Sequence, residues 1–221
     1  MVGLVDMNPL NAPTQKEFIW VMRHGRTALD DLHRSDGWLD LPLSDEGRQE
    51  IVEVLSEYLK HVPFTCIYCA PLRRTEETAH ILQSGITTHP EIETADDAMT
   101  WNLGSLAGDP KAPNKVVVRD LLANPEKSAP DGESYEDFCE RFDKWQDKQF
   151  DEVGTDGPFL EILSGSNCRR LSERLFNDRA VLDIDESGLF VLYRDVNGKW
   201  TADVITGHRN GDDLENNPYA S

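Results

Sequence analysis

The chain has 221 residues, 38% of them hydrophobic, and its 41 acidic and 22 basic side chains give a net charge of −19. This length and apolar content predict a folded domain with a sizeable core and exclude a disordered chain. The acidic surface disfavours binding to nucleic acid or to an anionic membrane, and the sequence lacks the run of about 18 apolar residues that a membrane-spanning helix needs.

We predict that the four cysteines are reduced residues of the core: Cys66, Cys69, Cys139 and Cys168. Cys66 and Cys69 have a CxxC spacing, but they fall in an expected strand, where residues three apart face opposite sides. No second pair of ligands stands at a suitable spacing, so we expect no metal site and no other cofactor. Residues 1–16 lack the basic start and apolar block of a secretory signal. These features together predict a cytoplasmic protein.

The first part of the chain has the pattern of alternating strands and helices. Phe18–Met22 is a short apolar run that ends at a glycine turn, as expected of a buried strand. Ser44 is a good helix N-cap and is followed by two acidic residues, which favour the first turn of a helix. Phe64–Cys69 is expected to be the next strand and Leu72–Leu82 the next helix. This order predicts an α/β fold with a mainly parallel sheet.

The middle of the chain differs in composition from the flanking segments. Residues 87–130 are rich in proline, glycine and aspartate, which predicts an insertion over the edge of the sheet. Residues 135–150 have the periodicity of an amphipathic helix, with three aromatic residues on one face. Phe159–Leu163 is expected to be a strand, and a polar turn separates it from a helix over 168–177.

The C-terminal part predicts a β-hairpin. Two strands are expected over Gly188–Arg194 and Lys199–Ile205, joined through Asn197-Gly198, a pair that favours a turn with positive φ at both positions. The polar residues after these strands are expected to form a loop. The chain is therefore predicted to comprise an N-terminal arm (1–17), one domain (18–205) that contains a lid insertion (87–130), and a polar tail (206–221).

Three polar turns follow the three predicted parallel strands. In an open α/β sheet, ligands bind beyond the carboxyl ends of the strands, so neighbouring turns of this kind converge. Two of the turns supply Arg23 and Arg74, whose guanidinium groups suit bidentate contact with a phosphate. His24 stands between them as a candidate nucleophile toward phosphorus. The turns are residues 23–26, 70–74 and 164–170.

Four sequence blocks resemble the histidine phosphatase superfamily, which includes the cofactor-dependent phosphoglycerate mutases. They are VMRHGRTALD, GWLDLPLSDEGRQE, IYCAPLRRTEETAHIL and PDGESYEDFCERF. These blocks stand in the order of the family and cover most of residues 18–175. The resemblance implies a three-layer sandwich, in which a mainly parallel central sheet is flanked by helices and carries an inserted lid. The hairpin predicted above would follow at the C-terminal end.

The resemblance also implies roles for individual residues. His24 matches the histidine that is transiently phosphorylated, and Arg23 and Arg74 match the arginines that bind the phosphate. The glycine after His24 would let the backbone approach the ligand, and Thr27 would orient the loop. The residues expected to contact the substrate around this centre are Gly25, Arg26, Thr27, Asp30, Gly165 and Ser166.

The sequence departs from the family at the second histidine. The family has a Ser/Thr–His–Gly block after a later strand, and here Ser164 is followed by Gly165. That histidine donates a hydrogen bond to the transferred phosphoryl group, and loss of one such donor typically costs about a hundred- to thousandfold in rate. His208 is the only histidine later in the chain, and it follows the predicted hairpin.

Two further positions depart from the family. The acid is commonly a glutamate four residues before the first of two glycines spaced by four, and here Thr100 holds that place. Asp97 and Glu133 are the candidate replacements; Glu133 matches a family position near the site, although it also suits the first turn of a helix. Asp30 replaces a frequent asparagine, and an ionised carboxylate would repel a phosphate oxygen.

These observations leave two hypotheses open. In the first, the chain is a phosphomonoester hydrolase that acts through a phosphohistidine at His24, with weak or lost activity because Gly165 replaces the second histidine. In the second, it is a catalytically inactive relative that serves as a binding, structural or assembly component. The first predicts a phosphorylated small molecule or inorganic phosphate as ligand, and the second is compatible with a homo-oligomer or a larger assembly. Neither predicts a nucleic-acid or membrane partner.

Overall fold

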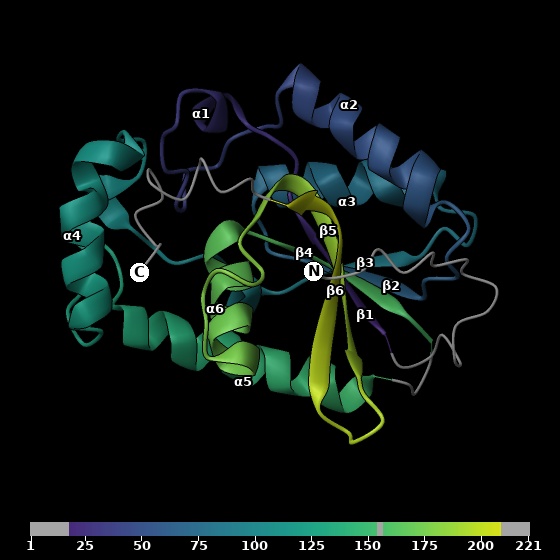
Figure 1. Cartoon of the computed structure of the whole chain (residues 1–221). Coiled ribbons are helices and arrows are strands. Elements are labelled where there is room, and N and C mark those ends of the chain that lie inside the picture. Colours follow the sequence, from purple (N-terminus) through teal and green to yellow (C-terminus); the bar gives the residue numbers. More distant parts are fainter. Residues whose placement is uncertain (1–17, 154–156, 209–221) are drawn as a thin grey trace.

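The central sheet has six strands in the order β3-β2-β4-β1-β5-β6 (Figure 1). The computed structural model describes residues 18–153 and 157–208. Pairs β1–β4, β2–β4 and β2–β3 are parallel, whereas β5 pairs antiparallel with β1 and with β6. The strands are β1 (Ile19–Arg23), β2 (Cys66–Cys69), β3 (Glu91–Thr94), β4 (Phe159–Leu163), β5 (Ile184–Arg194) and β6 (Trp200–His208).

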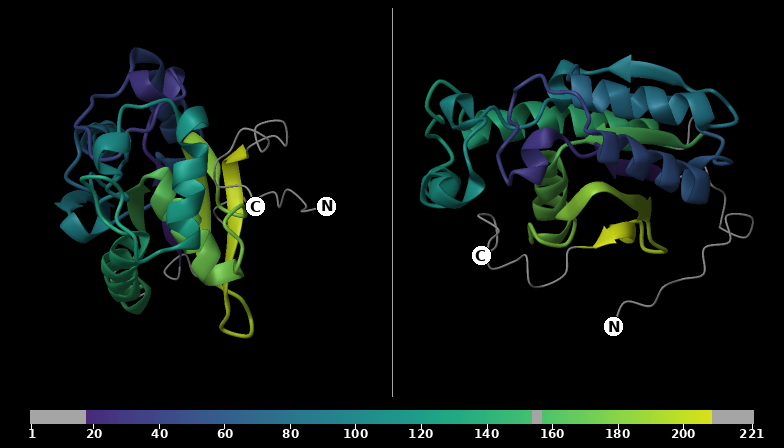
Figure 2. Two further views of the ribbon diagram at one scale, coloured as in Figure 1. Left: turned by 90° about the vertical axis from the view of Figure 1, so that its left-hand side faces the viewer. Right: turned by 90° about the horizontal axis from the view of Figure 1, so that it is seen from above.

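Helices cover both faces of this sheet, so the predicted three-layer sandwich is confirmed (Figure 2). Helices α2 and α3 pack on one face, and α5 and α6 pack on the other. The α-helices are α1 (Ala28–Asp31), α2 (Asp45–Val54), α3 (Arg73–Gly85), α4 (Lys111–Ala123), α5 (Tyr135–Glu152) and α6 (Gly165–Phe176). A π-helical turn, η2 (Leu55–Leu59), follows α2. Two short 3-10 helices are η3 (Asp96–Ala98) and η4 (Gly104–Leu106). Among the described residues, no helix is both long and apolar enough to span a bilayer.

Local sequence explains where the helices begin. The hydroxyl of Ser44 accepts a hydrogen bond from the Gly47 amide at the start of α2, as an N-cap does. The hydroxyl of Ser134 caps α5 in the same way, through the Asp137 amide. Helix α5 then buries an aromatic row against the sheet, made up of Tyr135, Phe138, Phe142 and Trp145.

The alternation of side chains along the strands divides the core in two. Cys66 belongs to the cluster under α5 and α6, whereas Cys69 belongs to the cluster under α2 and α3. The two cysteines of the CxxC spacing thus face opposite sides of β2, as the strand prediction required. All four cysteines carry free thiols.

Three details of the fold differ from the sequence-based expectation. Helix α6 begins at Gly165, three residues before the predicted start, because β4 ends at Leu163 and Ser164 is already at the N-cap position. In the hairpin turn only Gly198 has positive φ, since a hydrogen bond from the Asp195 amide to the Lys199 carbonyl closes a longer loop than the predicted two-residue turn. Strand β6 continues to His208, beyond the predicted end of the domain at residue 205. The predicted arm, 1–17, lies outside the described residues, as does the tail after His208.

The expected insertion over 87–130 has two distinct parts. Its first part supplies β3, the edge strand next to β2, so it belongs to the sheet itself. Its second part contains α4, which stands beside the sheet at the end where α1 lies (Figure 1). The start of α4 brings Lys111 to the carboxyl ends of the strands, and this residue reappears in the pocket described below.

Strand β4 carries an acidic residue in the centre of the core. Glu161 is fully buried, and its Oε1 accepts a hydrogen bond of 3.0 Å from Gln146 of α5. Its Oε2 and the amide oxygens of Gln146 and Gln149 have no hydrogen-bond partner among the described residues. A protonated carboxyl would supply the donor that these acceptors lack. Burial raises the pKa of Glu161 to about 8, which agrees with a neutral side chain near neutral pH.

The buried Glu161 makes stability depend on pH. Its carboxyl binds a proton more tightly in the folded than in the unfolded chain, so the free energy of unfolding falls as pH rises from about 4.5 to about 8. Glu161→Gln removes this dependence while keeping shape and adding a donor, and we expect it to stabilise the fold by about 1–4 kcal/mol at pH 9. Urea unfolding at pH 5 and pH 9 measures the difference. Glu93→Gln, on the exposed side of β3, is the matched control. Equal effects of Glu161→Gln at both pH values would contradict the prediction.

Candidate active site

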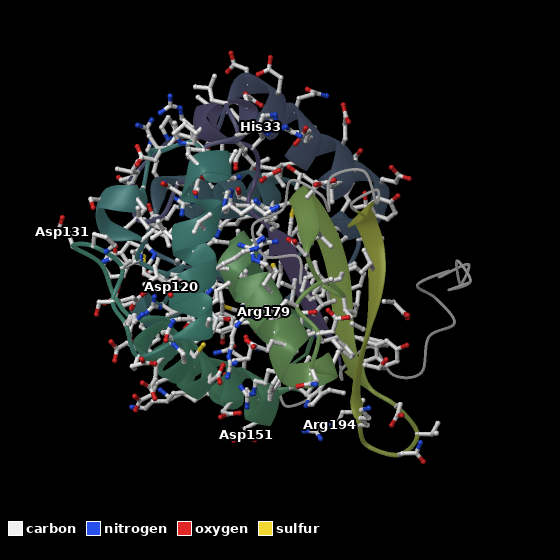
Figure 3. All side chains as sticks on the ribbon, turned by 60° about the vertical axis from the view of Figure 1, so that its left-hand side comes forward. His33, Asp120, Asp131, Asp151, Arg179 and Arg194 are labelled. Atoms are coloured by element: carbon white, nitrogen blue, oxygen red, sulfur yellow. The ribbon has the colours of Figure 1, made fainter. Side chains whose placement is uncertain are left out.

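The turns after β1, β2 and β4 converge on one pocket, because these three strands are neighbours in the sheet. The pocket has a volume of about 530 Å³ and lies at the carboxyl ends of the parallel strands. Of the residues predicted for the site, it is lined by Arg23, His24, Arg26, Asp30, Arg74, Gly165 and Ser166. Acidic residues such as Asp120, Asp131 and Asp151 lie around the outside of the molecule instead (Figure 3).

His24 is held as a neutral imidazole with one nitrogen available as a nucleophile. Its Nδ1 lies 2.9 Å from the Gly25 carbonyl oxygen, so this nitrogen carries the proton and donates. Its Nε2 accepts a hydrogen bond of 3.2 Å from the Nε of Arg74, and therefore carries a lone pair. Burial holds the pKa of His24 well below its usual value, and the positive charges of Arg74 and Arg23 lower it further.

Arg74 lies in the floor of the pocket and is 1% exposed. Besides His24, its guanidinium donates to the carbonyl oxygens of Leu39, at 2.9 Å, and of Gly37, at 2.8 Å. A carboxylate oxygen of Asp36 lies 3.8 Å from its Nε. These contacts fix the plane of the guanidinium, which keeps it next to the histidine nitrogen.

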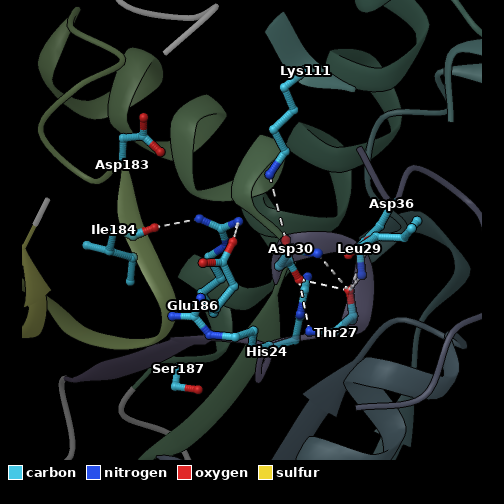
Figure 4. Close-up of polar contacts among 12 residues, drawn as sticks. His24, Thr27, Leu29, Asp30, Asp36, Lys111, Asp183, Ile184, Glu186 and Ser187 are labelled. Atoms are coloured by element: carbon cyan, nitrogen blue, oxygen red, sulfur yellow. Dashed lines mark hydrogen bonds and ion pairs between the residues drawn. The ribbon is translucent and has the colours of Figure 1, made fainter. Parts of the chain in front are cut away.

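Arg23 is bound by an acidic residue that no motif in the sequence singled out. Its guanidinium donates to the Ile184 carbonyl oxygen at 2.7 Å and forms a close ion pair with the carboxylate of Glu186 (Figure 4). Although burial by itself would raise the pKa of Glu186, Arg23 and then Lys111 hold it well below its usual range. Glu186 is therefore ionised. Its carboxylate binds the guanidinium of Arg23, which the family resemblance assigns to a phosphate.

Asp30 lies on the wall of the pocket next to this pair. Its Oδ2 accepts hydrogen bonds of 3.0 Å from both the amide and the hydroxyl of Thr27, which caps the short helix α1. Its Oδ1 lies 3.7 Å from the ammonium group of Lys111. The negative charge of the Glu186 carboxylate acts on the Asp30 carboxyl. Burial, together with Glu186 and Asp36, raises the pKa of Asp30 to about 7.

Two predicted residues support the pocket from behind without lining it. A Cβ atom at Gly25 would lie 2.5 Å from the Ile51 side chain, so glycine is required for the packing of α2. Thr27 is fully buried, and its hydroxyl is within hydrogen-bond distance of both Asp30 and Asp36. Arg26 lies at the rim, where it pairs with Glu50 at 3.3 Å.

The space beside Gly165 contains guanidinium groups. A Cβ atom at this position would lie 3.2 Å from Nη1 of Arg169 and 3.2 Å from Cζ of Arg23. Arg169 is bound to Asp183 at 3.0 Å. Of the described residues that line the pocket, only His24 and His33 are histidines, and His33 is exposed beside α1 (Figure 3).

The structure does not bring Glu133 into the pocket. Its two carboxylate oxygens bind Arg141, at 2.6 and 3.0 Å, and one of them also accepts from the Asn102 amide at 2.7 Å. Asp97, the other candidate acid, does not line the pocket either. Thr100, which holds the family's acid position, does line it, and its carbonyl oxygen accepts hydrogen bonds from the side chains of Trp38 and Arg141.

The charges of the pocket favour an anion over a metal ion. Ligand atoms of His24, Asp30 and Asp36 lie within 4.8 Å of one another, which is close enough to surround a cation. However, the positively charged guanidinium groups of Arg74 and Arg23 lie beside the histidine ring. A divalent cation at this point would be repelled by these fixed positive charges. A phosphate would instead find N–H donors on two sides.

Sequence comparison connects the chain with proteins of known family. The profile of the histidine phosphatase superfamily (branch 1) matches residues 19–157, more than half of the chain. A 2,3-bisphosphoglycerate-dependent phosphoglycerate mutase of Chlamydia trachomatis serovar L2 is 37% identical over 59 residues, which are 27% of this chain and 26% of the relative. The 2,3-bisphosphoglycerate-dependent phosphoglycerate mutase 2 of Gloeobacter violaceus is 27% identical over 128 residues, 55% of this chain and 58% of the relative. The chain thus matches between about a quarter and somewhat over half of the length of these relatives.

Solved structures share the fold over a larger part of the chain. Phosphoglycerate mutase from Bacillus anthracis str. Sterne superposes with a TM-score of 0.73 at 22% identity, over 86% of this chain and 94% of that one. A mycobacterial glucosyl-3-phosphoglycerate phosphatase superposes with a TM-score of 0.66 at 22% identity, over 85% of this chain and 97% of that one. At this level of identity, the similarity shows the fold.

Removal of the carboxylate that occupies Arg23 is expected to strengthen anion binding. Glu186→Gln keeps the shape of the side chain but removes its charge, so we expect the affinity for inorganic phosphate to rise about tenfold or more. Without phosphate the variant should be less stable, because the Arg23 guanidinium loses its buried counter-charge. Calorimetric titration measures the affinity, and thermal unfolding with and without phosphate measures the stability.

A surface carboxylate provides the control for this experiment. Glu77 pairs with Arg48 and Arg73 outside the pocket, so Glu77→Gln should leave phosphate affinity unchanged. Equal phosphate affinities of Glu186→Gln and the unaltered chain would contradict the competition between Glu186 and phosphate for Arg23.

Proposed function

The chain belongs to the histidine phosphatase superfamily, and we propose that it is a phosphomonoester hydrolase that acts through a phosphohistidine at His24. The observation that carries this proposal is the unprotonated Nε2 of a buried His24, flanked by the guanidinium groups of Arg74 and Arg23. A neutral imidazole can attack phosphorus, and the two arginines can stabilise the charge on the phosphoryl oxygens.

The pocket suits a small phosphorylated molecule. Its volume of about 530 Å³ lies within the range of small-molecule sites. The related proteins are named as phosphoglycerate mutases and as a glucosyl-3-phosphoglycerate phosphatase, and both classes act on phosphorylated compounds. Trp101, Leu103 and the start of α4 also line this pocket, so they are available to contact the substrate.

We propose a low rate for this hydrolase. No imidazole follows Ser164, so one family donor to the transferred phosphoryl group is missing. In addition, a substrate phosphate must compete with Glu186 for the Arg23 guanidinium. Both features lower the activity without removing the nucleophile.

A second candidate function is binding without catalysis, as a pseudoenzyme. The observation that favours it is the pairing of the pocket cations with acidic residues of the chain itself: Arg23 with Glu186, Arg74 with Asp36 and Lys111 with Asp30. Such a protein would hold an anion weakly, or serve in a homo-oligomer or larger assembly.

The free thiols are compatible with the proposed cytoplasmic location.

A trapping experiment separates the two candidates. After incubation of the chain with 4-nitrophenyl phosphate and a rapid quench in base, we expect phosphate bound to the His24 ring, detected by mass spectrometry of the tryptic peptide. His24→Ala should remove both this adduct and nitrophenol release. His80→Ala, which removes an exposed histidine of α3, should change neither. If the unaltered chain gives neither the adduct nor nitrophenol, the hydrolase proposal is overturned and binding without catalysis remains as the candidate function.

A further inference from the structure

Phosphate transfer from an ester needs an acid for the leaving group, and neither candidate from the sequence faces the pocket. Glu133 is bound to Arg141, and Asp97 does not line the pocket. Thr100, which holds the family's acid position and lines the pocket, has no group that titrates in the physiological range. The carboxyl groups that do line the pocket are those of Asp30, Asp36, Asp185 and Glu186. The further inference concerns Asp30, and it rests on the proposed function.

Asp30 and Glu186 form a carboxyl pair that requires one proton. Both carboxyl groups line the same pocket, and the negative charge of Glu186 acts on Asp30, so the two cannot both be ionised without strong repulsion. Glu186 is held in the ionised form by its ion pair with Arg23. The proton of the pair therefore resides on Asp30.

The other groups around Asp30 come from four segments of the chain. From the start of α1, the amide and hydroxyl of Thr27 contact its Oδ2, and from the loop after α1 the carboxylate of Asp36 approaches. From α4, the ammonium of Lys111 lies 3.7 Å from its Oδ1, and from β1 the guanidinium of Arg23 is near. Burial and the two carboxylates outweigh the two cations, since the pKa of Asp30 is raised to about 7.

The position of Asp30 suits proton transfer to a leaving group. One of its carboxylate oxygens lies within 4.8 Å of a ring nitrogen of His24. In an in-line attack with the nitrogen about 3 Å from phosphorus, the leaving oxygen lies about 5 Å from that nitrogen. An acid at the distance of Asp30 can therefore come within hydrogen-bond range of the leaving oxygen.

We propose that Asp30 is the general acid that protonates the leaving-group oxygen, and that Glu186 is the positioning residue that keeps the proton on it. In the first step, the lone pair of His24 Nε2 forms a bond to phosphorus, and the bond from phosphorus to the ester oxygen breaks. That oxygen takes the proton of Asp30 and departs as an alcohol. The chain is left with phosphorylated His24 and an Asp30 carboxylate.

The second step uses the same carboxyl group in reverse. A water molecule attacks phosphorus, and its proton passes to the Asp30 carboxylate. The phosphorus–nitrogen bond breaks, and its electron pair returns to His24 Nε2. Inorganic phosphate is released, and both His24 and Asp30 regain their starting protonation states.

The test compares two substrates that differ in their need for an acid. 4-Nitrophenyl phosphate has a leaving group that departs as a stable anion, whereas phenyl phosphate has a similar shape and a more basic leaving oxygen. With enzyme in excess, phenol release in the first turnover reports the phosphorylation step alone. We expect Asp30→Asn to slow this step about a hundredfold or more with phenyl phosphate, but less than about tenfold with 4-nitrophenyl phosphate. Phosphohistidine should accumulate in the variant, because the second step loses its base.

Two further measurements separate an acid from a residue that only supports the fold. In the unaltered chain, the first-turnover rate with phenyl phosphate should fall as pH rises above about 7, where Asp30 loses its proton. In Glu186→Gln this decline should move to lower pH, because removal of the Glu186 charge lowers the pKa of Asp30. Asp36→Asn removes one carboxylate charge from the same pocket, and it should affect the two substrates to the same extent.

The outcomes distinguish this inference from the function on which it rests. An unaltered chain without phenol release or phosphohistidine from either substrate would overturn the hydrolase proposal and the role of Asp30 with it. An active chain in which Asp30→Asn slows both substrates equally, or leaves the decline with pH in place, would overturn only the role of Asp30. A loss confined to phenyl phosphate, with the 4-nitrophenol burst retained as evidence of a folded site, supports it.

Discussion

The ion pair between Arg23 and Glu186 determines the electrostatics of the whole pocket. An arginine cannot release its proton when it is buried, so the fold must supply acceptors for its guanidinium. The chain supplies them from the start of β5, through the Ile184 carbonyl and the Glu186 carboxylate. This contact joins the end of β1 to the start of β5. It also places a fixed negative charge where a phosphate oxygen would bind.

The protonation states of the other groups follow from this pair. Burial and the ionised Glu186 raise the pKa of Asp30 to about 7, so Asp30 keeps its proton below that pH. Burial and the charges of Arg74 and Arg23 lower the pKa of His24, so His24 stays neutral and its Nδ1 proton points to the Gly25 carbonyl. The same buried network thus favours an unprotonated His24 and a protonated Asp30, which are the two states that the proposed phosphoryl transfer requires.

The central part of the site could be predicted from sequence because it is encoded locally. His24 and Arg23 end one strand, Arg74 opens the helix after the next, and the adjacency of parallel strands brings these turns together. Glu186 and Lys111 gave no signal, since they come from the start of β5 and from the inserted helix α4, where no motif marks a residue as facing the pocket. Glu133 illustrates the converse, because its place in a motif did not reveal that Arg141 would bind both of its oxygens. The burial of Glu161 could not be predicted for a similar reason. The pattern of a strand shows which face of the sheet a side chain lies on, but it does not show whether a hydrogen-bond partner lies opposite.

The replacement of a histidine by Gly165 has a different meaning in three dimensions than in the sequence. The sequence suggests an empty place where a donor is missing. In the structure, the guanidinium groups of Arg169 and Arg23 lie 3.2 Å from the point where a Cβ atom would stand, so the place is filled by N–H donors. An imidazole there would displace them and would disturb the contacts of Arg23 with Ile184 and Glu186. The glycine is therefore part of the same arrangement as the ion pair, and the two features cannot be changed independently.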